Sequence, residues 1–111
     1  MKVGQAVHIP AKIIRVINDS SCPDWLELRF FDAHGAEWTV EEKAPVVTCE
    51  VVVSGDPYLG DAVIAGIIVG ERTINYGRQV FLVDTEKPWG IEAKCGATRF
   101  EMFAEHLTLD T

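Results

Sequence analysis

The chain has 111 residues, with ten Lys and Arg against 17 Asp and Glu, a net charge of −7 and 48% hydrophobic residues. These values describe one soluble acidic domain over residues 1–111, too short for two ordinary domains. The acidic balance argues against nucleic acid as the main partner, because phosphate contacts need clustered Lys and Arg. Thirteen Val and nine Ile against six Leu favour strands over helices, since β-branched side chains suit a pleated surface.

The apolar runs and the cysteines exclude further classes. The longest apolar run, residues 62–69, is far shorter than the roughly 20 residues that span a bilayer. No secretory signal pattern is visible, so we expect a cytoplasmic protein with no membrane partner. Cys22, Cys49 and Cys95 are widely spaced and the histidines are isolated from them. This spacing predicts no disulfide framework, no metal site and no cofactor.

The first predicted strand covers residues 3–18. Polar and apolar residues alternate up to Ile13, and the phase slips at Ile14. One extra residue reverses the faces of all later side chains, so the slip predicts a bulge or strong bend. Pro10 should occupy an unpaired or edge position, because proline has no N–H to donate. Residues 18–24 have the composition of a loop.

Trp25–Phe31 and residues 36–42 predict a hairpin whose register can be chosen from the sequence. Pairing Asp32 with Ala36 closes the apolar face, whereas a one-residue shift sets charged residues against apolar ones. The chosen register implies a three-residue loop with Gly35 in the left-handed conformation. It predicts the pairs Phe30 with Trp38, Leu28 with Val40, Glu27 with Glu41 and Arg29 with Thr39.

The middle of the chain predicts a second hairpin. Residues 46–54 are a possible strand, and residues 55–61 are a loop by composition. Residues 62–69 are apolar at both odd and even positions, as in a strand that is buried on both faces. Residues 79–84 are its expected partner across a loop over residues 71–78 that contains an Asn-Tyr-Gly turn.

A third hairpin is expected around a two-residue Cys95-Gly96 turn, because that register sets opposite charges together and apolar residues together. It predicts the pairs Glu92 with Arg99, Ile91 with Phe100 and Trp89 with Met102. Trp89 is thereby placed in the core, together with Phe30, Trp38 and Phe100. Residues 101–109 are compatible with a strand or a short helical tail.

These elements predict an all-β domain of about six to seven antiparallel strands built from hairpins. The architecture is a small barrel or sandwich, SH3-like or OB-like, with a short helical tail as an option. An exposed edge at residues 51–53 would permit a homodimer.

No arrangement of residues in the sequence supports catalysis. The serines have no histidine nearby, and Cys22 stands among acidic residues that oppose thiolate formation. Asp32 and His34 invite an acid–base interpretation. However, an Asp at the start of a type I turn ordinarily binds its own backbone, and the following His ordinarily faces solvent. We therefore predict no catalytic residue and no enzyme.

The outer face of the first hairpin is the candidate interaction surface. Its aromatic and charged residues have the composition of a protein interface, unless a second layer such as residues 101–109 covers them. This surface, the hairpin face, comprises Trp25, Glu27, Arg29, Phe31, Glu37 and Glu41. Glu27 and Glu41 oppose each other, so they should be solvated or should meet a cation from elsewhere.

Four short motifs lie at turns and strand ends: PDW at 23–25, FDAHG at 31–35, EKAPVV at 42–47 and TEKPWG at 85–90. Together they resemble a family of small uncharacterised bacterial β-rich proteins. The resemblance implies a bacterial cytoplasmic protein with an SH3-like or OB-like barrel. It implies no activity and no catalytic residue.

The sequence predicts a protein-interaction module rather than an enzyme. Residues 18–42 carry seven acidic residues against one arginine. This acidic region predicts a basic protein partner, as in an immunity-like inhibitor that associates quickly through electrostatic steering. The alternative is a small-ligand-binding barrel in which Trp25, Trp38 or Trp89 forms an aromatic wall, and a small hydrolase comes last.

Overall fold

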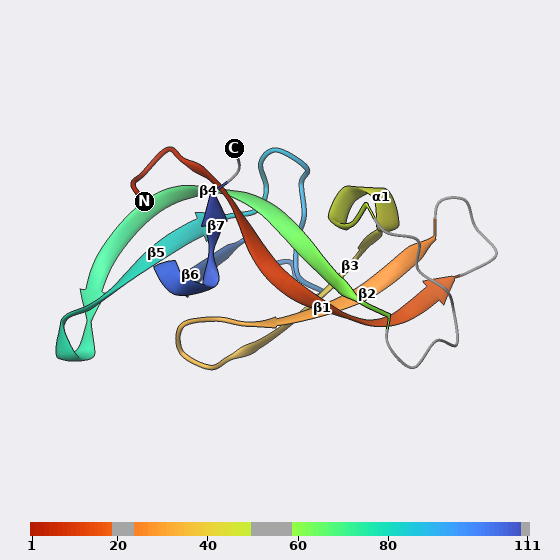
Figure 1. The fold of residues 1–111 in the computed structure, drawn as a ribbon, viewed down its shortest axis with the longest axis horizontal. Coiled ribbons are helices and arrows are strands. Elements are labelled where there is room, and N and C mark those ends of the chain that lie inside the picture. Colours follow the sequence, from red (N-terminus) through yellow and green to blue (C-terminus); the bar gives the residue numbers. More distant parts are fainter. Residues whose placement is uncertain (19–23, 50–58, 110–111) are drawn as a thin grey trace.

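Two long antiparallel strands, β1 (Ala6–Asn18) and β4 (Asp61–Ile74), cross the middle of the structure (Figure 1). The computed structural model describes residues 1–18, 24–49 and 59–109. The other strands in these ranges are β2 (Trp25–Phe31), β3 (Glu37–Lys43), β5 (Arg78–Asp84), β6 (Arg99–Phe103) and β7 (Thr108–Leu109). They form one curled half-barrel sheet in the order β3-β2-β1-β4-β5-β6, with β7 paired to β1. The predicted mostly β fold of antiparallel strands is confirmed.

Strand β1 has partners along both of its edges. Strand β4 pairs with residues 6–12 on one edge, while β7 and β2 pair with the two ends of the other edge. The register against β2 shifts between Ile13 and Arg15, so the bulge predicted from the phase slip is confirmed. A bulge bends its strand, which lets β1 serve both halves of the curled sheet.

The β2–β3 hairpin has the predicted register at all four predicted pairs. Asp32 donates its backbone N–H to the Ala36 carbonyl at 3.0 Å, and Gly35 has a φ of +78°. Both features belong to the predicted three-residue loop with a left-handed glycine. The alternation of apolar and polar residues therefore determines this hairpin correctly.

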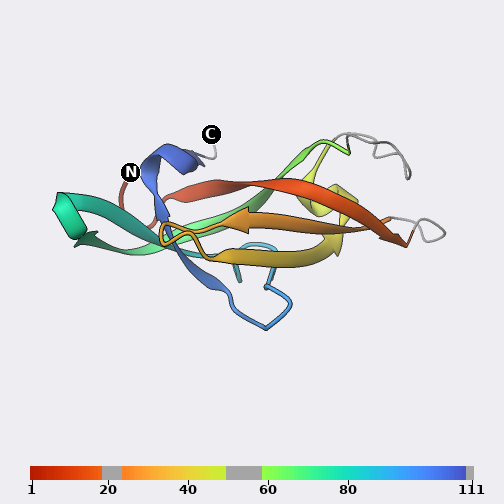
Figure 2. The same ribbon diagram turned by 90° about the horizontal axis from the view of Figure 1, so that it is seen from below.

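Strands β4 and β5 extend as a two-stranded ribbon from one end of the structure (Figures 1 and 2). The predicted pairing of residues 62–69 with 79–84 is confirmed, with one register shift. The predicted loop over residues 71–78 is wrong, because β4 continues to Ile74 and only the 3-10 turn η1 (Asn75–Gly77) reverses the chain. Residues near this turn are exposed and polar, since the projecting ribbon has no core beneath it.

The third predicted hairpin is wrong in its pairing. Strand β6 pairs with β5 instead of residues 89–92, so that Phe100 opposes Val83 and Met102 opposes Phe81. The free edge of β5 offers a longer row of apolar partners than the segment before the turn. The nearest residues in sequence are therefore not the partners of β6.

The turn at Gly96 also differs from the prediction. Ala93 donates its N–H to the Ala97 carbonyl at 2.8 Å, which closes a three-residue loop instead of a two-residue turn. Gly96 has a φ of +91° and supplies the left-handed conformation at the last loop position. Trp89, predicted to lie in the core, is 62% exposed because its segment does not pair with β6.

Two short helical segments replace predicted or undecided strands. The helix α1 (Ala44–Val47) begins with Pro45 in its first turn, a position that tolerates a missing N–H. It occupies the start of the strand predicted over residues 46–54. Residues 50–58 lie outside the described residues, and so does the predicted dimer edge at residues 51–53. Residues 101–109 contain the end of β6, the 3-10 turn η2 (Ala104–His106) and β7.

The concave side of the half-barrel encloses the core, which takes one face from each long strand. Its fully buried larger side chains include Ile9, Leu26, Leu28, Val40, Ile64, Ile68, Val83, Ile91 and Met102. The Phe100 ring lies edge-on to both Phe30 and Trp38, with centroids 5.1 and 4.9 Å away. This cluster joins β2 and β3 to β6, so it closes the curled sheet on itself.

Candidate functional site

The hairpin face lies on the outside of β2 and β3, away from the core. Trp25 is 37% exposed and Phe31 is 53% exposed, so residues 101–109 do not cover them. Of the two interpretations given for these aromatic residues, the structure selects the exposed one. The paired positions of β2 and β3 place all six residues of the hairpin face on the same side of the sheet.

The carboxylates of the hairpin face are already paired with cations. Lys94 Nζ lies 3.4 Å from Glu41 and 3.9 Å from Glu27, which confirms that the opposed glutamates meet a cation from elsewhere. Arg15 Nε lies 3.3 Å from the same Glu27 carboxylate. These cations come from β1 and from the loop before β6. The negative charge of this face is therefore largely compensated.

The remaining charges of the hairpin face are balanced in the same way. Arg29 lies 3.6 Å from Glu37, and the ammonium group of Lys43 lies 5.7 Å from the Trp25 ring centroid. The excess of acidic residues in this part of the sequence therefore does not produce a strongly acidic hairpin face. Its distinguishing feature is the exposed aromatic pair among balanced charges, a composition common at protein interfaces.

A groove of about 590 Å³ opens beside the hairpin face, between the end of β2 and η2. Its volume lies within the range of small-molecule pockets. Its apolar lining comprises Phe30 and Phe31 of β2 together with Pro10, Ala11, Ala62, Val63 and Met102. Among the described residues, its polar lining consists of Lys12, Arg29, Asp32, Asp61, Glu105 and His106.

Pro10 explains why the groove opens. Ile13 donates its backbone N–H to the carbonyl of Gly60, the residue just before β4. Because backbone groups alternate in direction along a strand, those of Lys12 and Pro10 point toward β2. The last pair between β1 and β2 is Lys12 with Arg29, and Phe31 would come opposite Pro10. Proline cannot donate to the ladder, so the strands separate there. Pro10 pairs with Val63 of β4 and has no partner in the β1–β2 pairing, so the predicted unpaired position is found on the β2 side of β1 alone.

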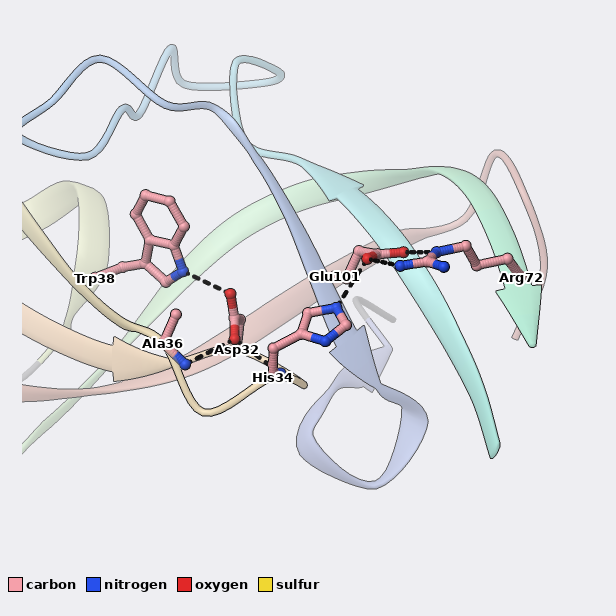
Figure 3. A network of polar contacts seen from close by, with 6 residues as sticks. All are labelled: Asp32, His34, Ala36, Trp38, Arg72 and Glu101. Atoms are coloured by element: carbon pink, nitrogen blue, oxygen red, sulfur yellow. Dashed lines mark hydrogen bonds and ion pairs between the residues drawn. The ribbon is translucent and has the colours of Figure 1, made fainter. Parts of the chain in front are cut away.

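Asp32 organises the tip of the β2–β3 hairpin (Figure 3). Its Oδ1 accepts the backbone N–H groups of His34 and Ala36 at 2.8 and 3.0 Å, and its Oδ2 accepts the Trp38 indole N–H at 2.9 Å. Asp32 therefore binds its own loop, as the turn chemistry predicts. The His34 imidazole turns away from this carboxylate, so the two side chains do not form an acid–base pair.

The His34 ring instead contacts Glu101 on β6, and Arg72 approaches the same carboxylate from β4 (Figure 3). The His34 Nε2 to Glu101 Oε1 distance is 2.9 Å, and the Arg72 guanidinium donates two hydrogen bonds of 2.5 and 2.6 Å. The Arg72 bonds lower the pKa of Glu101 from its ordinary 4.5 to about 2, against the opposing effect of partial burial. His34 adds to the lowering.

The contacts of Glu101 join the tip of the β2–β3 hairpin to β6 beside the groove. The backbone N–H of Ala33 donates to the Glu101 carbonyl at 2.8 Å, so the loop after Phe31 is attached to β6 through backbone and side chain. Met102, the next residue of β6, lines the groove. These contacts therefore attach the hairpin tip, which carries Asp32 of the groove lining, to β6, which carries Met102. Sequence reasoning missed this connection because its partners are 67 and 29 residues apart.

The tryptophans do not form the wall of this groove. Trp38 is partly buried against Phe100, while Trp25 lies on the outer face of β2 and Trp89 is exposed elsewhere. The aromatic residues that line the groove are Phe30 and Phe31 instead. The signal that could have located the groove from the sequence is Pro10 opposite the end of a strand.

The described part of the chain shows no group of three or more His, Cys, Asp or Glu residues able to hold a metal ion. Within the same ranges, no helix has the length and apolar character needed to cross a membrane. No protein-family model, curated protein or solved structure matches the chain. The resemblance of the four motifs to a bacterial β-rich family therefore stays a prediction.

Proposed function

We propose that the chain is a non-catalytic cytoplasmic binding module that docks another protein on the hairpin face and the adjoining groove. The observation that carries the proposal is Phe31, an aromatic side chain 53% exposed where the hairpin face meets the groove. Exposed aromatic residues beside a concave apolar surface are typical centres of binding energy in protein interfaces. The free cysteines Cys49 and Cys95 are compatible with a reducing compartment.

The balanced charges of the hairpin face shape this proposal. Each carboxylate of the face already has a cation within 4 Å. A basic partner would therefore gain little binding energy from charge attraction to this face. The binding energy is instead assigned to Trp25 and Phe31, which lie at opposite ends of β2. An immunity-like role is one form of such binding, in which the partner is a toxin or an enzyme.

The test is quantitative capture of partners from an extract of the source cells, followed by binding measurements with the purified partner. Trp25→Ser combined with Phe31→Ser should weaken binding by at least about tenfold. Trp89→Ser is the matched control, since Trp89 is 62% exposed but lies outside the hairpin face. Equal losses in both variants, or no loss in the double variant, would contradict the proposed surface.

A small-ligand-binding barrel is a second candidate, favoured by the volume and the apolar lining of the groove. Native mass spectrometry of protein purified from the source cells distinguishes the two functions. A stoichiometric small molecule that Val63→Trp displaces would favour the ligand function, since Val63 lines the groove and is 38% exposed. Protein without such a molecule, together with a captured partner, would favour the protein-binding function.

A further inference from the structure

The groove carries a charge that the hairpin face does not. Lys12 is paired with Asp61 at 2.8 Å, and Arg29 is paired with Glu37 at 3.6 Å. Among the groove's other acidic side chains, Glu105 is paired with Arg78 on β5. These pairs cancel each other's charge at the groove.

Asp32 is the exception among the acidic residues of the groove. Its three hydrogen-bond donors are two backbone N–H groups and one indole N–H, all of them neutral. In the described ranges no cation is paired with this carboxylate. Oδ1 accepts two hydrogen bonds, but Oδ2 accepts only one, so one acceptor position of Oδ2 is left. A negative charge and a vacant acceptor position thus coincide at one carboxylate oxygen.

The rest of the groove is suited to an aliphatic chain. Seven of its described lining residues are apolar, and among them Phe31 has an exposed ring. Pro10 contributes a ring and no N–H donor, so this part of the lining needs no polar partner. Arg and Lys side chains combine an apolar stem with a charged head, and both also bind aromatic faces.

We propose that the groove takes a basic side chain, arginine or lysine, presented by the partner protein. The aliphatic stem lies against Phe31 and Pro10, and the cationic head donates to Asp32 Oδ2. This inference rests on the proposed function, because it names the chemistry of the partner residue that enters the groove. It therefore requires one basic side chain on the partner, and it does not require a broad basic surface that faces a broad acidic one.

The test uses small probes that need no knowledge of the partner. Isotope-labelled protein is titrated by NMR with N-acetylarginine methylamide, its lysine counterpart, and the uncharged citrulline isostere. The basic probes should shift the methyl signals of Ala62 and Met102 and the indole N–H signal of Trp38. They should bind at least about tenfold more tightly than citrulline at low salt, and the preference should shrink as salt rises.

Asp32→Asn keeps an oxygen for the two backbone donors and removes the charge, so it should abolish the preference for basic probes. Glu71→Gln removes the same charge from the projecting ribbon and should leave the preference intact. If Asp32→Asn fails to fold, Phe31→Ser provides the second variant, and it should weaken both basic probes. Equal binding of citrulline and arginine, shifts outside the groove, or no saturable shifts with any probe would overturn the inference.

The outcomes separate this inference from the proposed function. If the probes fail but partner capture depends on Trp25 and Phe31, the proposed function stands and the basic side chain is wrong. If the arginine probe binds at Asp32 but capture is indifferent to the Trp25 and Phe31 substitutions, the groove is a cation site and the protein-binding function is wrong.

Discussion

The two main hairpins of the structure differ in how their tips are built and what those tips contact. The β2–β3 tip uses Gly35 in the left-handed conformation, is tied together by Asp32 and is docked on β6 through Glu101. The β4–β5 tip projects from the end of the structure with Tyr76 at a φ of +62° and fully exposed (Figure 2). The docked tip is held by the side chains of its own loop, whereas the turn residues of the projecting tip are exposed and its contacts with β6 and η2 come from the flanking Arg72 and Arg78.

The two tips differ in the residue that adopts the left-handed conformation and in the contacts of the loop. A left-handed conformation is permissive for glycine but unfavourable for a residue with a Cβ atom. At the docked tip the permissive residue is used, and the loop is attached to β6. At the projecting tip Tyr76 adopts this unfavourable conformation beside Gly77, which has a φ of +73°, and the Tyr76 side chain is fully exposed. Substitutions at the two tips should therefore differ in their effect on stability.

Asp32→Ala should lower the free energy of unfolding by about 3 kcal/mol. The substitution removes the acceptor of three hydrogen bonds, each contributing about 1 kcal/mol, and leaves the Trp38 indole N–H without its partner. Urea unfolding followed by tryptophan fluorescence measures the change. Asp61→Ala is the control and should change stability by less than about 1 kcal/mol, because its pair with Lys12 is exposed. Similar losses in both variants would mean that Asp32 does not organise the tip.

Glu101→Gln should lower the free energy of unfolding by about 1.5 kcal/mol at pH 7. This value is well below what the full pKa shift implies, since solvent screens a partly exposed pair. The folded-state pKa of about 2 lies below the ordinary 4.5, so the charged group stabilises the fold above pH 4.5. That contribution is lost as the pH falls from about 4.5 to 2.

The difference between the wild type and Glu101→Gln should therefore shrink over this acid range. Chemical unfolding at a series of pH values from 7 to 2 measures it. A difference that stays constant down to pH 2 would show that the effect of the substitution does not come from the charge on Glu101.

Particular residues show why one hairpin was predictable and another was not. The register of β2 against β3 follows from local alternation, and Gly35 fixes the loop length, so both were predicted correctly. The partner of β6 is β5, and nothing within the sequence around Gly96 excludes the nearer segment over residues 89–92. Pairing between distant segments depends on the free edge that the rest of the sheet leaves, and a local pattern does not contain it.

The candidate site also has features that local sequence patterns predicted and features that they did not. The residues of the hairpin face were predicted from alternation along β2 and β3. The compensation of their charges was only partly predicted, because Lys94 and Arg15 come from other elements. The position of Pro10 was predicted only in part, since it pairs with β4 and lacks a partner on the β2 side, and the groove was not predicted. The groove also requires η2 on its far side and the docking of the hairpin tip on Glu101.

Tyr76→Asn should raise the free energy of unfolding by about 1 kcal/mol. Asparagine adopts the left-handed conformation more readily, and Tyr76 is fully exposed, so the substitution relieves strain without losing packing. Thermal unfolding measures the gain. Tyr76→Phe is the control and should leave stability unchanged, because it keeps the aromatic ring and the strain. A gain with phenylalanine equal to that with asparagine would contradict this explanation.

Glu71→Gln at the projecting ribbon should change the free energy of unfolding by less than about 0.5 kcal/mol. Glu71 accepts a hydrogen bond from Gln79 at 3.0 Å, a distance close to that between His34 and Glu101 at the docked tip. The geometry of the two contacts is thus alike, but only the Glu101 contact joins distant elements and is shielded by them. Urea unfolding of the variant beside Glu101→Gln measures the contrast. A loss at Glu71 as large as that at Glu101 would mean that the ribbon is held by its side chains as firmly as the docked tip, and would remove the distinction between them.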